Sequence, residues 1–339
     1  MKIVKIAFSS LVALLFSTIV FADINVTGAG SSAVNPIVSK WAEAYASKGV
    51  RVNYASIGSG GGIKQINAKT VDFGASDGPV KGDDLDKHGQ VQFPDVVFGI
   101  SVVHNLKGFA DAELKLDQKT LADIFLGKIT VWNDSSIAKL NPGKKLPSSK
   151  ITVVHRSDGS GTTGAFTEYL SMISSEWKDK VGKGKTVKWP SKGATGAKGN
   201  EGVSSIVKRI DGAIGYVEYN HAKKVKIAGF SLKNKAGKFV APNLDSFAAA
   251  ASNADWGSKP GMGISLNNQP GDASWPITSP SFIIMYKNPT DAKKSKAALA
   301  FFKYGFTTGK KDVAALDYVP LPDNVVAYIE KNIWSQIKN

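Results

Sequence analysis

Three glycine-rich turns constrain the fold of this chain more than any other feature of its sequence. They span residues 27–32, 58–62 and 158–163, and each lies between an apolar, β-branched run and a segment with helical periodicity. A strand that passes through a short glycine turn directly into a helix is the repeating unit of layered α/β folds. The turns therefore predict an α/β protein.

The rest of the sequence alternates in the same way. Strand-like runs cover residues 24–27, 51–57, 71–75, 96–104, 151–155, 213–219 and 282–286. Helical patterns begin near Pro36, Thr162, Gly202, Thr290 and Pro322. Two stretches, 182–202 and 257–270, are expected to be long loops. The length of 339 residues favours two domains rather than one.

The N-terminal 22 residues have the pattern of a secretory signal peptide. Lys2 and Lys5 precede an apolar stretch over residues 6–21, which ends at the small residue Ala22. A membrane anchor is the alternative, but the stretch is shorter than the roughly 20 apolar residues that a span needs. We therefore expect cleavage after Ala22 and export of the mature chain. Export without a single cysteine favours a bacterial envelope compartment.

Several kinds of active site are excluded or disfavoured by residues that are missing. The absence of cysteine excludes disulfides, thiolate metal sites and a cysteine nucleophile. The four histidines have no metal-ligand spacing, and no GxSxG motif surrounds Ser160. A possible dinucleotide motif at Gly28 lacks the acidic residue that should follow the next strand, and a P-loop would need glycine where Asp179 stands. We expect no cofactor, no metal and no hydrolase triad.

The net charge of +15 calls for an anionic partner. Only three of the 43 basic residues are arginines, whereas nucleic-acid readers rely on arginine for bidentate contacts, so we expect no nucleic-acid partner. The densest lysine run extends from Lys178 to Lys198 and is opposed within that span only by Asp179. It is interpreted either as a solvated loop or as a field that gathers small anions.

The residues of the three turns are suited to an oxyanion. Backbone N–H groups at helix N-termini, with serine or threonine hydroxyls, donate hydrogen bonds to such ligands. Any one turn could equally be a glycine turn with an N-cap residue. The third turn adds more: Arg156, held by Asp158, could present two donors to a tetrahedral anion, while Ser160 and the amides of Gly161 and Thr162 cover its other oxygens. An ordinary ion pair followed by a helix cap is the alternative.

These motifs together resemble one family, the periplasmic phosphate-binding proteins of Pst-type ABC importers. The resemblance covers essentially the whole mature chain. It rests on TGAG at 27–30, GSGGG at 58–62, VDFGASD at 71–77, the Arg156–Thr162 motif, GAIGYVEY at 212–219 and WPIT at 275–278. It implies a two-domain Venus-flytrap fold whose chain crosses twice between domains, with domain I over residues 23–102 and 274–339 and domain II over residues 103–273.

The resemblance also implies a set of phosphate-binding residues and a partner. The residues at matching positions are Ser32, Ala33, Ser59, Asp77, Arg156, Asp158, Ser160, Gly161 and Thr162. Where the family usually has Thr-Phe-Pro, this chain has Ser-Ala-Val at 32–34, so an aromatic wall is missing there. The implied partner is the permease and ATPase complex of an ABC transporter in the inner membrane, and the implied protein is a periplasmic receptor without enzymatic activity. A monomer suits such a diffusing receptor.

Beside a bound anion, the carboxylate of Asp77 would select for an anion that carries a proton. A carboxylate repels an anion unless that anion brings a proton to donate. Phosphate at neutral pH keeps a proton and sulfate does not, so an aspartate acceptor admits the first and rejects the second.

Three alternatives stay open from the sequence. The cleft could take another oxyanion, the scaffold could carry an enzyme such as a phosphatase, or the lysines could serve a basic, polyanion-binding envelope protein.

Overall fold

The computed structural model describes residues 24–339, so the predicted signal peptide, residues 1–22, lies outside the described part of the chain. The α-helices are α1 (Asn35–Tyr45), α2 (Ser59–Asn67), α3 (Gly82–His88), α4 (Gln118–Phe125), α5 (Ser135–Leu140), α6 (Gly161–Ile173), α7 (Ser175–Lys180), α8 (Gly199–Arg209), α9 (Tyr219–Val225), α10 (Leu244–Ala251), α11 (Ala292–Phe306), α12 (Lys310–Ala315) and α13 (Asp323–Tyr328). The strands are β1 (Ile24–Gly30), β2 (Val50–Ser56), β3 (Phe73–Asp77), β4 (Gln90–His104), β5 (Lys115–Leu116), β6 (Thr152–Arg156), β7 (Thr195–Ala197), β8 (Ala213–Glu218), β9 (Ala228–Gly229), β10 (Ser231–Lys233), β11 (Phe239–Val240), β12 (Thr278–Tyr286) and β13 (Val319–Pro320). Among the described residues, no helix is both long and apolar enough to cross a bilayer.

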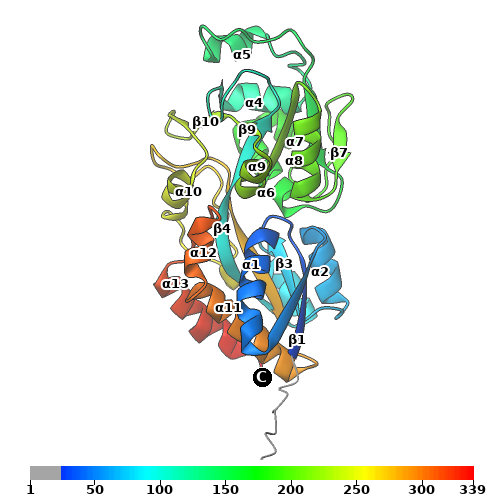
Figure 1. Cartoon of the computed structure of the whole chain (residues 1–339), viewed down its shortest axis with the longest axis vertical. Helices are drawn as coiled ribbons and strands as arrows, with labels where there is room; N and C mark the ends of the chain where they lie inside the picture. The colour runs from blue at the N-terminus through cyan, green and yellow to red at the C-terminus, as the bar shows by residue number, and fades with distance from the viewer. Residues whose placement is uncertain (1–23) are drawn as a thin grey trace, which may run out of the picture.

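The elements form two lobes, one above the other in Figure 1. The main sheet has the order β2-β1-β3-β12-β4-β8-β6-β7, and a small separate sheet has the order β11-β10-β5. We call the part with β1, β2, β3 and β12 lobe I, and the part with β6, β7 and β8 lobe II. Helices α1, α2 and α11 belong to lobe I, and helices α6, α7 and α8 belong to lobe II (Figure 1). The predicted α/β class is confirmed.

Strand β4 connects the two lobes. Its residues from Gln90 to Gly99 pair with β12 of lobe I, whereas those from Ile100 to His104 pair with β8 of lobe II. All 15 residues of β4 are buried. The pairing of β12 with β4 shifts by a β-bulge between Pro280 and Phe282. The division into residues 23–102 with 274–339 and residues 103–273 stays a prediction.

Parallel pairing decides where the functional turns lie. In lobe I, β1 is parallel to both β2 and β3, so Gly30, Ser56 and Asp77 end their strands at one edge. In lobe II, β6 is parallel to both β7 and β8, so the ends of those three strands also share one edge. Crevices at the carboxyl ends of parallel strands are the usual binding sites of α/β proteins. Here both edges face the boundary between the lobes.

Each lobe is packed around its own aromatic cluster. In lobe I, Trp41 of α1 contacts Phe301 of α11 edge to face, with ring centroids 6.3 Å apart. In lobe II, Phe166 of α6 stacks on Tyr216 of β8 at 4.4 Å. Trp41, Phe166 and Tyr216 are all fully buried, and truncating such a ring typically costs about 3–5 kcal/mol of stability. The rigid lobes therefore hold the turns between them in place.

The structure differs from the sequence predictions at several elements. Strand β4 begins at Gln90, whereas the sequence predicts its start at 96. The prediction misses the first residues because Gln90, Gln92 and Asp95 are buried polar residues that break the apolar run. The expected loop over 182–202 contains β7 and the beginning of α8. The last helical pattern consists of α13 followed by a π-helical turn at Ile329–Ile333 and a 3₁₀ turn at Trp334–Gln336.

Candidate anion-binding site

The three glycine-rich turns meet between the lobes. The first follows β1, the second begins α2, and the third joins β6 to α6. A backbone hydrogen bond from Gly60 N to Gly159 O, 2.8 Å long, joins the second turn to the third across the boundary. Turns separated by about a hundred residues in the sequence thus form one site.

Arg156 and Asp158 form the bidentate pair that their spacing suggests. Arg156 Nε donates to Asp158 Oδ1 at 2.7 Å, and Arg156 Nη2 donates to Asp158 Oδ2 at 2.5 Å. The arginine side chain is 1% exposed. Burial by itself would raise the pKa of Asp158, but the hydrogen bonds and charge of Arg156 hold it below its usual value. Asp158 takes two of the five guanidinium donors, so the remaining three are oriented for another partner.

Asp77 links the end of β3 to lobe II. Its Oδ1 accepts a hydrogen bond from Ser31 Oγ, and its Oδ2 accepts one from Thr162 Oγ1 at 3.1 Å. Its backbone N–H donates to Ser59 Oγ at 3.1 Å. Burial raises the pKa of Asp77, while Ser31 and the charge of Arg156 oppose the rise. The carboxyl is therefore a buried acceptor already surrounded by hydroxyl donors.

Ser32 and Ala33 lie where β1 passes into α1. Ser32 Oγ accepts hydrogen bonds from both the backbone N and Nδ2 of Asn200, each 3.0 Å long. The carbonyl of Ser32 accepts from His221 Nε2 at 3.0 Å. Ala33 N donates to Ser31 Oγ at 3.0 Å. Asn200 and His221 belong to α8 and α9, so lobe II reaches this turn from two helices.

The N-terminus of α6 closes the site from lobe II. Ser160 is its N-cap, and Ser160 Oγ accepts from Thr163 N at 3.0 Å, which leaves the hydroxyl proton for another acceptor. A Cβ at Gly161 would lie 2.4 Å from Ser59 Oγ and 2.5 Å from Asp77 Cβ, so only glycine fits here while the lobes are together. The first-turn amides of this 13-residue helix carry partial positive charge toward the boundary.

The structure thus brings all nine predicted residues to one place, and it adds four that the sequence reasoning missed. Ser31 stands inside the first turn and could have been included from its position alone. Asn200, His221 and Lys185 come from segments without a recognisable motif. Lys185 belongs to the lysine-rich stretch, for which the sequence predicts a solvated loop or a diffuse field, yet its side chain reaches Ser76 of lobe I at 2.5 Å.

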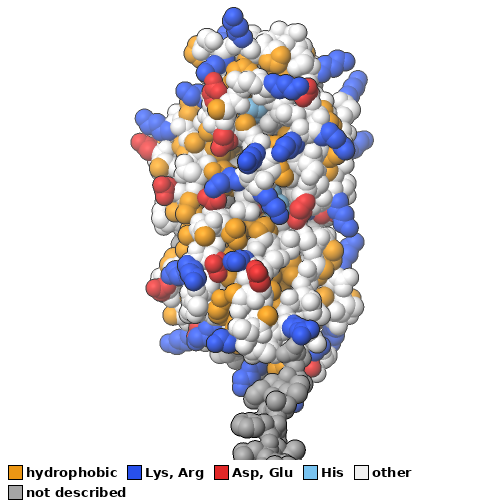
Figure 2. All heavy atoms as spheres, in the orientation of Figure 1, with side chains coloured by type: hydrophobic (Ala, Val, Ile, Leu, Met, Phe, Trp, Pro, Cys, Tyr) orange, Lys and Arg blue, Asp and Glu red, His pale blue; other side chains and the backbone are white. Residues whose placement is uncertain are grey.

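The other charges are spread over the molecule. Lysine and arginine side chains are distributed over the whole face seen in Figure 2, with acidic side chains between them. Within the lysine-rich stretch, Lys180 pairs with Glu176 and Lys183 pairs with Glu168, each at 2.8 Å. In residues 24–339, no group of three or more His, Asp or Glu side chains could hold a metal ion.

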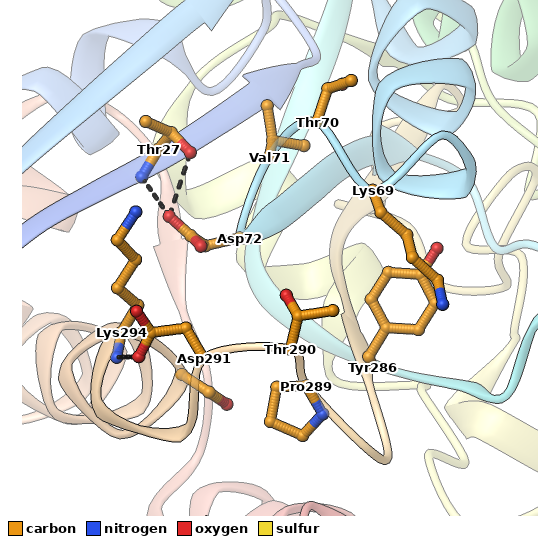
Figure 3. A pocket seen from close by; sticks show the side chains of 11 residues that line it. Thr27, Lys69, Thr70, Val71, Asp72, Tyr286, Pro289, Thr290, Asp291 and Lys294 are labelled. Carbon is orange, nitrogen blue, oxygen red and sulfur yellow. Dashed lines mark hydrogen bonds between the residues drawn. The ribbon is translucent and has the colours of Figure 1, made fainter.

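Two cavities differ in their relation to the site. One, of about 490 Å³, lies beside the site and is lined by Asp77 and Lys185 among others. The other, of about 190 Å³ and shown in Figure 3, lies in lobe I between β1 and the N-terminus of α11. In the second cavity, Asp72 accepts from both Thr27 N and Thr27 Oγ1, and Asp291 caps α11. Its carboxylates are therefore engaged in local structure, and none of the nine predicted residues lines it.

Known proteins resemble this chain in sequence and in fold. A family profile described as a PBP superfamily domain matches residues 21–308. A protein of Pasteurella multocida (strain Pm70) named "Phosphate-binding protein PstS" is 51% identical over 332 residues, covering 97% of this chain and 96% of that protein.

Two solved structures extend the comparison to the fold. The X-ray structure of a phosphate-binding protein from Stenotrophomonas maltophilia has a TM-score of 0.66 at 20% identity and covers 90% of this chain and 92% of its own. A high-affinity periplasmic phosphate-binding protein bound with phosphate has a TM-score of 0.70 at 20% identity, covering 91% and 93%. These likenesses confirm the predicted two-domain binding-protein fold.

Proposed function

This chain belongs to the PBP superfamily and, within it, to the family of phosphate-binding proteins named PstS, and on that premise we propose that it binds inorganic phosphate between its lobes and delivers it to an ABC transporter. The observation that carries the proposal is the meeting of three glycine-rich turns around the Arg156–Asp158 pair and the buried carboxyl of Asp77. Such a site offers many donors and one acceptor, which is the pattern that a protonated oxyanion requires.

Both lobes supply groups to the ligand in this proposal. From lobe I come the hydroxyls of Ser32 and Ser59, the amide of Ala33 and the acceptor Asp77. From lobe II come Arg156, held in place by Asp158, and the helix start formed by Ser160, Gly161 and Thr162. Arg156 supplies a fixed fork for two phosphate oxygens, and Asp77 accepts the phosphate proton.

Closure of the lobes around the ligand follows from this division of contacts. Only the closed form places donors of both lobes on one anion, so the ligand stabilises that form over the open one. In the structure, cross-boundary hydrogen bonds such as Thr162 to Asp77 and Asn200 to Ser32 already join the lobes. A transporter permease would then recognise the closed, loaded shape.

The remaining expectations concern the setting of the protein. We propose that it is exported to the periplasm and acts there as a monomer, with the permease and ATPase complex of an importer as its partner. No step of the proposed cycle makes or breaks a covalent bond, so we expect no enzymatic activity and no cofactor.

A calorimetric titration of phosphate into dialysed protein that begins at Asp23 tests the proposal. We expect one tight site per chain. Absence of phosphate binding would overturn the proposed function, and binding of another oxyanion in preference to phosphate would assign the cleft to that anion instead.

A further inference from the structure

Lys185 lies in the lysine-rich stretch but is placed differently from its neighbours. Lys183 and Lys188 are exposed, whereas Lys185 is only partly exposed. Its Nζ donates to Ser76 Oγ at 2.5 Å, and Ser76 is a fully buried residue of β3 in lobe I. Ser76 Oγ in turn donates to the carbonyl of Gly78 at 3.0 Å, so its lone pair is free to accept from the ammonium.

The backbone of the same residue contacts the other side of the site. The carbonyl of Lys185 accepts a hydrogen bond from Ser160 N at 2.9 Å, immediately before α6 begins. One residue therefore joins the N-cap of α6 in lobe II to the strand that carries Asp77 in lobe I. Its ammonium can occupy this position only while the lobes are together.

The charges of the site show what this ammonium contributes. Arg156 is paired with Asp158, and the carboxyl of Asp77 lies close enough for the charge of Arg156 to act on it. Without Lys185, two carboxyl groups would face an anion with a single guanidinium to balance them. Lys185 restores the balance, and its charge interacts with that of Asp77.

We propose that Lys185 is a charge-balancing residue of the cleft, whose ammonium lets the site accept the phosphate dianion beside Asp77. The proposal rests on the proposed function and deepens it. It adds to the residues of the three turns a cation that comes from a loop and lies beside the bound anion.

The surroundings of Lys185 make its charge sensitive to pH. Burial lowers the pKa of Lys185 to about 8, and the charge of Asp77 opposes that effect. The charged side chains that share its cavity are Lys81, Lys183, Lys259, Glu168 and Asp77. Of these, Lys183 is paired with Glu168 at 2.8 Å, which leaves Asp77 as the carboxylate that acts on Lys185.

The test compares phosphate affinity at pH 7.5 and pH 9.5 for the parent, Lys185→Met, Lys185→Arg and the control Lys188→Met. Free phosphate is mostly the dianion at pH 7.5 and almost entirely so at pH 9.5. Because this small change is the same for the parent and for every variant, a difference between them in pH dependence reports on Lys185. A lysine that must be protonated for binding causes about a tenfold loss per pH unit above its pKa. We expect the parent and Lys188→Met to lose affinity between the two pH values.

The variants separate charge from structure. Lys185→Met should bind phosphate about 10-fold to 100-fold more weakly than the parent at pH 7.5. Its own affinity should change little between pH 7.5 and pH 9.5, because it has no cation left to lose at this position. Lys185→Arg keeps a cation that stays protonated at both pH values, so its phosphate affinity should not fall between pH 7.5 and pH 9.5. Parent-like affinity of Lys185→Met, or a parent-like pH dependence in that variant, would overturn the role of Lys185 while leaving the proposed function intact. A parent that binds no phosphate at all would overturn both.

Discussion

Asp77 of lobe I accepts a hydrogen bond from Thr162 of lobe II, with 3.1 Å between Asp77 Oδ2 and Thr162 Oγ1. The same carboxyl accepts a hydrogen bond from Ser31 on its other oxygen. An anion that enters this place meets a carboxyl whose partners are movable hydroxyls, which can rotate to donate to the anion instead. Binding therefore exchanges one set of hydrogen bonds for another without leaving the buried carboxyl unpaired.

Replacing Arg156 by alanine should weaken phosphate binding by a factor on the order of 10² to 10³, because a buried, charge-paired donor typically contributes about 2–5 kcal/mol. Asp158→Asn should cause a milder loss, since the arginine stays but is held less firmly. Calorimetry measures both. Arg209→Ala, which changes an exposed arginine, is the matched control and should bind as the parent does. An unchanged Kd in Arg156→Ala would remove Arg156 from the site.

Replacing Gly161 by alanine should prevent the lobes from closing, because the new Cβ would lie 2.4 Å from Ser59 Oγ and 2.5 Å from Asp77 Cβ. We expect at least a tenfold loss of phosphate affinity and a larger radius of gyration in X-ray solution scattering with phosphate present. Gly257→Ala serves as the control, since a Cβ there meets no atom within 4 Å. Closure of Gly161→Ala to the dimensions of the parent would contradict the tight approach of the lobes.

The burial of Asp95 predicts that the stability of the folded chain depends on pH. It is 1% exposed on β4, and the backbone of Val96 and the hydroxyl of Ser281 only partly offset the effect of this burial on its pKa. Burial raises the pKa of Asp95 to about 7, so the folded chain keeps a proton that the unfolded chain releases near pH 4. The contribution of Asp95 to stability is therefore fully present below about pH 4 and is lost as the pH rises to about 7.

Asp95→Asn removes this titration. The melting temperature of the variant relative to the parent should increase by several degrees between pH 4.5 and pH 8.5. Because both proteins share every other titrating group, their difference isolates Asp95. A difference in melting temperature that does not depend on pH would show that Asp95 is not protonated in the folded chain.

The parts of the site that could be predicted from the sequence are those that are local in the chain. Arg156, Asp158 and Ser160 stand within five residues of one another, and the glycine turns mark their own strand-to-helix junctions. The sequence predicts strand β4 too short, because buried polar residues such as Gln92, which bonds to Val80 and Gly261, interrupt its apolar pattern.

The residues that sequence reasoning missed depend on the approach of the two lobes. Asn200 reaches Ser32 across 168 positions of sequence, and Lys185 reaches Ser76 across 109. Nothing in a lysine-rich stretch distinguishes the one lysine that turns inward from those that stay in solvent. That distinction comes from the closed arrangement of the lobes, which brings Ser76 within reach of the Lys185 ammonium.

The measurement that tests the central claim most directly is the Kd of phosphate, determined with and without a large excess of sulfate, for the parent and for Asp77→Asn. The account predicts that sulfate leaves binding by the parent unchanged, since a buried acceptor facing an unprotonated anion supports a discrimination on the order of 10³ or more. In Asp77→Asn, sulfate should compete. Displacement of phosphate by sulfate in the parent, or rejection of sulfate by the variant as strong as that of the parent, would contradict the account.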